Sequence, residues 1–206
     1  MYDTHQRTIE QYAKANANNW FKVIQFVLLT IQQPLWQVPK QMRQVNREGR
    51  DANCLWGIKG PAWTWHNENK NKTYDYAMLL DSVNPNPEWA AHDLLMYIAD
   101  LPGLGLAKGG FLAQCVFGLV GCLDSHNVAR FNLSMSQVSA SAFKSAKTLE
   151  TKRRKVSDYL ALCQELGGCQ GLWDSWCDYL YERNPDGGHY ANAFAVSAIH
   201  CEALGL

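Results

Sequence analysis

The sequence lacks several features that would assign it to a common class of protein. Its longest apolar stretch, residues 111–123, is interrupted by Gln114 and is too short to cross a bilayer. It has no strand-like alternation, internal repeat or low-complexity segment, which argues against a sheet protein, a solenoid and a disordered chain. Lys+Arg and Asp+Glu each total 19, so there is no net charge with which to coat nucleic acid by bulk electrostatics.

The cysteines also lack a recognisable pattern. There are seven, an odd number, with no Cys-x-x-Cys pair, and the closest group is Cys163, Cys169 and Cys177. This spacing argues against a disulfide framework and against zinc, so we expect small buried apolar residues, no metal and no cofactor. The polar N-terminus does not resemble a secretory signal. The expected location is the cytoplasm, without a membrane partner.

The residues that are present predict one all-α domain over residues 1–206. Apolar residues make up 47% of the chain, which is ample for a core. Residues 49–73 are expected to form an irregular loop because they combine glycines, Pro61 and a polar run. Three tryptophans within this loop either stack on a base or cover the site, or pack on the core: Trp56, Trp63 and Trp65. Apolar periodicity predicts helices over residues 5–17, 20–33, 39–47, 74–82, 88–100, 106–117, 125–131, 135–147, 151–166, 170–183 and 189–203.

The most informative segment is the tight turn Leu101-Pro102-Gly103-Leu104-Gly105, which separates two amphipathic helical stretches. A helix that restarts after such a turn leaves backbone N–H groups unpaired at its N-terminus. Glycines let a phosphate approach these groups, and the helix dipole favours the anion. The turn therefore predicts a grip on a nucleic-acid backbone, although a simple helix–turn–helix connector would have a similar sequence.

An acidic residue follows the turn at the end of a buried apolar run. The stretch reads Asp124-Ser125-His126-Asn127-Val128-Ala129-Arg130. Asp124 either caps the next helix or performs chemistry beside the turn, and the two roles are compatible because a capping carboxylate is held rigidly.

Together these residues resemble the helix-hairpin-helix DNA glycosylase superfamily, in which a catalytic Asp follows the hairpin by about 20 residues in an Asp-Thr-His-Val-x-Arg-like stretch. A further similarity is Leu28-Leu29-Thr30-Ile31-Gln32, which resembles the superfamily's Leu-Leu-Ser-x-Gln, whose Gln lies near the DNA. The resemblance covers residues 20–131, with the hairpin and the Asp within 88–131. It implies the all-α helix-hairpin-helix glycosylase-like fold.

Two departures from the superfamily pattern narrow the expected chemistry. Bifunctional members carry a lysine nucleophile two residues after the second hairpin glycine, where this chain has Ala107, and Lys108 comes one residue later. One residue rotates a helical side chain by about 100°, so Lys108 need not face the same pocket. The cysteines also do not reproduce the iron–sulfur loop of some members. The chain is therefore unlike a lyase-type repair enzyme.

The hairpin and the Asp124 stretch are more similar to a bacteriophage branch associated with thymidine hypermodification. Members of that branch are described as amino acid:DNA transferases or putrescinyl-thymidine pyrophosphorylases. The resemblance implies an enzyme that acts on double-stranded DNA carrying modified thymine, in the cytoplasm of the host cell if the gene belongs to a phage. A small amine or amino acid would replace pyrophosphate on the 5-methylene of activated 5-hydroxymethyluracil in a base that is flipped out of the stack.

These expectations assign four candidate catalytic residues. Asp124 is the base or the stabiliser of a cationic methylene intermediate. Lys108 binds DNA phosphate or the leaving group, unless it is an ordinary solvated lysine. His126 and Asn127 orient Asp124 or the substrate, or are simply residues of a helix start.

The candidate DNA-binding residues lie in three parts of the chain. Gly103, Leu104 and Gly105 are expected to hold the DNA backbone, and Gln32 is expected to lie near the flipped base. Lys144 and Lys147 belong to the densest basic patch, which is either a phosphate contact or a solvated helix face. Two other functions remain open: a monofunctional DNA glycosylase, and a non-catalytic DNA-binding module in which Asp124 only caps a helix.

Overall fold

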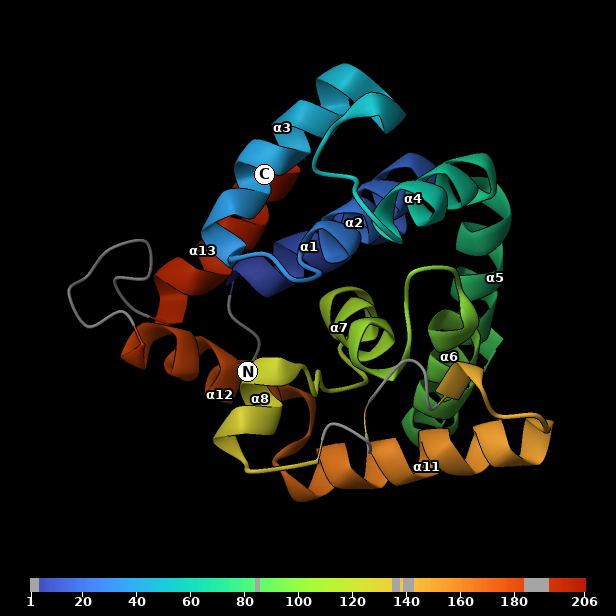
Figure 1. The fold of residues 1–206 in the computed structure, drawn as a ribbon. Coiled ribbons are helices and arrows are strands. Elements are labelled where there is room, and N and C mark those ends of the chain that lie inside the picture. The colour runs from blue at the N-terminus through green and yellow to red at the C-terminus, as the bar shows by residue number, and fades with distance from the viewer. Residues whose placement is uncertain (1–3, 84–85, 135–137, 139–142, 184–192) are drawn as a thin grey trace.

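A computed structural model describes residues 4–83, 86–134, 138, 143–183 and 193–206 (Figure 1). The described chain is helical and contains no strand, which confirms the all-α prediction. Short 3₁₀ turns cover Leu35–Gln37 and Gly49–Asp51. The helices are α1 (Thr4–Ala15), α2 (Ala17–Leu29), α3 (Val38–Glu48), α4 (Lys59–Glu68), α5 (Lys70–Val83), α6 (Pro87–Asp100), α7 (Leu106–Phe117), α8 (Ser125–Arg130), α11 (Leu149–Glu165), α12 (Gly168–Glu182) and α13 (Ala193–Leu204).

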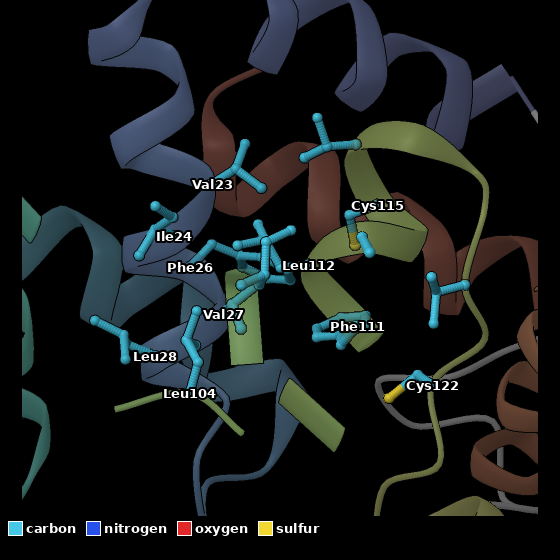
Figure 2. Close-up of a cluster of buried hydrophobic side chains, with 14 of the residues drawn as sticks. Val23, Ile24, Phe26, Val27, Leu28, Leu104, Phe111, Leu112, Cys115 and Cys122 are labelled. Atoms are coloured by element: carbon cyan, nitrogen blue, oxygen red, sulfur yellow. The ribbon is translucent and has the colours of Figure 1, made fainter. Parts of the chain in front are cut away.

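Helix α7 lies at the centre of the molecule and forms the core with α2 (Figure 1). Ten of its twelve residues are buried, and only Ala107 and Lys108 are half-exposed. Helix α2 is apolar on most sides, and it begins where the Asn16 side chain accepts hydrogen bonds from the amides of Asn18 and Asn19. Figure 2 shows side chains of these two helices meeting in one hydrophobic cluster. The central position of α7 fixes the turn that precedes it.

That turn joins α6 to α7, which pack against each other. Asn86 caps α6, and Pro87 at its first position needs no hydrogen-bond donor there. The turn closes with a hydrogen bond of 3.2 Å from the Leu104 amide to the Leu101 carbonyl oxygen. Gly103 has a φ of +75°, a conformation that side chains with a Cβ rarely adopt. The expected helix–turn–helix unit is therefore present, with α7 spanning residues 106–117 as predicted.

Two side chains from elsewhere hold the turn in place. His66 of α4 donates from Nε2 to the Pro102 carbonyl oxygen at 2.9 Å, and Lys144 donates from Nζ to the Leu101 carbonyl oxygen at 2.8 Å. His66 is fully buried. Burial lowers the pKa of His66 to about 4, although the bond to Pro102 opposes this shift. The turn is thus fixed by a neutral histidine.

We expect the stability of the protein to fall as the pH drops from about 6.5 to about 4. In this window His66 is protonated in the unfolded chain but not in the folded chain. The free energy of unfolding therefore falls by up to about 1.4 kcal/mol for each pH unit. The His66→Gln variant, which keeps an N–H donor for Pro102, should lack this component. Urea unfolding of both proteins across the window measures it. The same pH dependence in both would rule out a neutral His66 in the native state.

The largest error of the sequence-based prediction concerns residues 49–73. Residues 52–58 are irregular as predicted, but residues 59–73 form α4 and the start of α5. Pro61 lies in the first turn of α4, where its missing N–H costs nothing. Trp63 donates to the Gln25 side chain at 2.9 Å, and Trp63 and Trp65 pack on the core. Trp63 and Trp65 therefore follow the packing alternative, whereas Trp56 is exposed and does not pack on the core.

The other helix predictions agree with the structure to within a few residues where they fall on described residues. Residues 135–137, 139–142 and 189–192 of two expected helices lie outside the described residues. The helix expected over 135–147 does not extend to its predicted end, because residues 145–147 are not helical. None of the seven cysteines forms a disulfide bond, and all but the half-buried Cys169 are buried, as expected for small apolar residues. No helix in the described part of the chain is long and apolar enough to span a membrane.

Candidate functional site

A cavity of about 860 Å³ opens beside the N-terminal end of α7. Four segments that are distant in the sequence meet there: the end of α2, the α6–α7 turn, the start of α8 and the end of α12. It is lined by Thr30, Ile31, Gln32, Gln33, Pro34, Leu35, Trp36, Ile58, Gly103, Leu104, Gly105, Ala107, Lys108, Phe111, Asp124, Ser125, His126, Trp176, Tyr179, Leu180 and Arg183. This volume is typical of a site for one small molecule or one nucleotide.

Seven of the ten predicted site residues line this cavity. They are Gln32, Gly103, Leu104, Gly105, Lys108, Asp124 and His126. Gln32 follows the end of α2 with a φ of 50°, a left-handed conformation that is costly for a residue with a side chain. Such strain is retained where the surrounding structure imposes it, often at a binding site.

Asp124 is the N-cap of α8, and its carboxylate is almost fully engaged. Oδ1 accepts from the amides of His126 and Asn127 at 2.9 and 3.2 Å, and Oδ2 lies 3.0 Å from Nδ1 of His126. Burial raises the pKa of Asp124, but the hydrogen bonds from His126 and Asn127, the charge that His126 carries when it is protonated, and the charge of Lys108 outweigh burial and lower the pKa overall. Asp124 is therefore a fixed carboxylate that is ionised at neutral pH.

The segment that leads to Asp124 is positioned by Tyr159 of α11 and by Asn127. The Tyr159 hydroxyl donates to the Gly121 carbonyl oxygen at 3.0 Å and accepts from the Leu123 amide at 2.9 Å. Asn127 donates from Nδ2 to the carbonyl oxygens of Cys122 and Leu172. Its side chain is fully buried and does not line the cavity, so any effect of Asn127 on the site passes through the backbone.

Lys108 lies at the start of α7, close enough to Asp124 for its charge to lower the pKa of that carboxyl. Its Nζ donates to the Thr30 hydroxyl at 2.9 Å and lies 5.5 Å from the centre of the Phe111 ring. The lysine is therefore held at the cavity wall between the ends of two helices. It is a positive group that an anion can reach.

A second lysine, Lys59, lies behind this wall and was not expected. It is fully buried, its Nζ lies 4.6 Å from the centre of the Trp56 ring, and it donates to the Leu29 carbonyl oxygen at 3.4 Å. Burial, with a further contribution from Lys108, lowers its pKa to about 8. Lys59 thus holds the C-terminal end of α2, next to the cavity. No sequence signal marked it, because it fell in the region expected to be a loop.

The wall formed by α12 was also missed. Trp176, Tyr179 and Arg183 also line the cavity, and the Arg183 guanidinium lies 4.7 Å from the centre of the Tyr179 ring. Their spacing of three and four residues puts them on one helix face. This spacing is the sequence signal from which the wall could have been predicted. Phe111 and Trp176, whose rings are 6.0 Å apart, extend the apolar wall toward the core.

The two predicted lysines of the basic patch do not reach the cavity. Lys144 is bonded to the Leu101 carbonyl oxygen, and Lys147 is exposed outside the cavity. Next to them, Lys152 pairs with Asp100 at 2.6 Å, while Arg153 and Arg154 are exposed. Lys144 and Lys152 therefore lie at the outside of the α6–α7 turn, where each is bonded to the end of α6 or the residue after it.

Within the described ranges, no group of three or more His, Cys, Asp or Glu side chains is arranged to hold a metal ion. No protein-family model, curated protein or solved structure matches the chain significantly.

Proposed function

We propose that the protein is a DNA base-modifying transferase with the helix-hairpin-helix glycosylase-like fold. Its substrate is double-stranded DNA that carries pyrophosphate-activated 5-hydroxymethyluracil. An amine or amino acid replaces pyrophosphate at the 5-methylene carbon. The C–O bond to pyrophosphate breaks, a C–N bond forms, and the amine loses a proton.

One observation carries this proposal: the α6–α7 turn and an ionised Asp124 line the same cavity, together with Lys108. A carboxylate stabilises positive charge that develops on the methylene carbon as the leaving group departs. Its lowered pKa suits this role better than the role of a base, because a weakly basic group accepts protons poorly. Of the two roles proposed for Asp124, base or electrostatic stabiliser, the lowered pKa therefore favours the electrostatic one.

The leaving pyrophosphate and the DNA backbone both need positive partners. Lys108 is the cation of the α7 wall, and Arg183 is the cation of the α12 wall. The first amides of α7 have no side-chain cap, so they are available to a phosphate at the turn. Outside the turn, Lys147, Arg153 and Arg154 supply exposed charge along the path of a duplex.

A monofunctional DNA glycosylase is the second candidate, and the same observation favours it. The ionised Asp124 would then stabilise an oxocarbenium ion at the sugar instead of a cationic methylene group. Ala107 stands at the position of the lyase nucleophile and Lys108 is bonded to Thr30, which argues against a bifunctional enzyme.

Nucleoside mass spectrometry separates these functions. The protein is incubated with duplex DNA containing pyrophosphorylated 5-hydroxymethyluracil and a set of amines, and the DNA is then digested to nucleosides. The expected product is a thymidine derivative heavier by the amine. Abasic sites would identify a glycosylase, and unchanged DNA would leave only a binding module; either result would overturn the proposed transferase.

A further inference from the structure

His126 forms a pair with Asp124 at the cavity. Its Nδ1 lies 3.0 Å from Oδ2 of Asp124, and its side chain is 38% exposed whereas that of Asp124 is 11% exposed. The His126 ring also meets the rings of Trp176 and Tyr179 at steep angles, with centres 6.4 and 5.8 Å apart. The ring is therefore held on one edge by a carboxylate and flanked by two aromatic side chains.

The chemistry of the pair fixes the direction of its hydrogen bond. An ionised carboxylate only accepts, so Nδ1 of His126 carries the hydrogen and donates it to Asp124. In the neutral ring the lone pair must then be on Nε2. Nε2 has no hydrogen-bond partner among the described residues, and His126 lines the cavity. The basic nitrogen is thus available to a bound molecule.

We infer that His126 is the general base of the reaction, with Nε2 taking the proton from the amine nucleophile and Asp124 holding the ring in the required tautomer. This inference rests on the proposed function. As the amine nitrogen bonds to the methylene carbon, its N–H electrons remain on nitrogen and the proton passes to Nε2. Pyrophosphate leaves with the electron pair of the C–O bond. The resulting imidazolium is stabilised by Asp124, which keeps its negative charge throughout.

Three further charged or titratable groups share the cavity with this pair. Lys108 approaches from α7, and Tyr179 and Arg183 approach from α12. At the far end of α8, Arg130 is neutralised by Glu182 at 2.7 Å. Among the described residues that line this cavity, His126 supplies the one imidazole, so a change in the pH profile on replacing His126 reports on the pair.

The experiment compares the wild-type protein with His126→Gln and His126→Ala in the nucleoside assay, as a function of pH. We expect kcat to fall by about 10²- to 10⁴-fold in both variants, with KM changed little. The decrease in kcat of the wild-type protein at acidic pH should be absent from both variants. Added imidazole should restore part of the rate of His126→Ala. Circular dichroism checks that the variants fold.

A matched control is available in His92, whose Nδ1 lies 3.3 Å from Asp93 Oδ1 and which does not line this cavity. His92→Gln should retain wild-type kcat. If His126→Gln keeps kcat within a few-fold with an unchanged pH profile, the inference is wrong while the proposed function stands. If the wild-type protein forms no product, the proposed function fails and the inference with it.

Discussion

Asp124→Asn is expected to reduce turnover by about 10³-fold while the protein still folds and binds DNA. Asparagine at an N-cap accepts the same backbone hydrogen bonds as aspartate, so α8 should keep its start. The amide lacks the charge that stabilises a developing cation, and it no longer holds His126 as an ionised carboxylate does. Single-turnover rates and binding to a labelled duplex measure the two effects separately.

Asp100→Asn is the matched control for this prediction. Asp100 lies beside the same turn, but its carboxylate pairs with Lys152 on the surface rather than lining the cavity. This variant should keep turnover within a few-fold. If Asp124→Asn also keeps turnover within a few-fold, Asp124 has no part in the chemistry and serves only as a helix cap.

Gly103→Ala is expected to lower the free energy of unfolding by about 2–5 kcal/mol. A left-handed φ costs a residue with a Cβ about 1–2 kcal/mol, and forced contacts in a packed core add about 1–3 kcal/mol. A Cβ at Gly103 would lie 2.7 Å from both the Ala62 Cβ and the Leu28 Cδ2, and φ there is +75°. Chemical denaturation measures the loss.

Gly57→Ala separates the conformational cost of a left-handed φ from the cost of the forced contacts. Gly57 has a φ of +59°, but a Cβ there would meet nothing within 4 Å, so only the conformational cost applies. Its loss should be about 1–2 kcal/mol. Equal losses in the two variants would mean that the turn is not packed against α2 and α4 as described.

The parts of the site that sequence patterns predicted are those with strong local signals. Gly103 marks a turn because few residues tolerate its φ, and the apolar run after Gly105 marks a buried helix. Asp124 was identified because a capping residue precedes a new helix start. These signals act over a few residues, so they are visible without knowledge of the fold.

The parts that were missed depend on tertiary packing. Residues 49–73 have the composition of a loop, yet α4 forms there because Trp63 and Trp65 bury themselves on the core. The α12 wall, including Tyr179, was missed because the local sequence of a helix does not indicate which other helices it packs against or which cavity it lines. Asn127 was expected in the catalytic group, but its side chain points into the backbone of neighbouring segments.

The most direct measurement is a structure of the Asp124→Asn protein bound to a duplex with one 5-hydroxymethyluracil. The expected result is a pyrimidine flipped into the cavity, with its 5-methylene carbon beside residue 124 and His126, and a backbone phosphate on the turn at Gly103 and Gly105. A base that stays stacked in the duplex, or DNA bound away from this cavity, would contradict the proposed function.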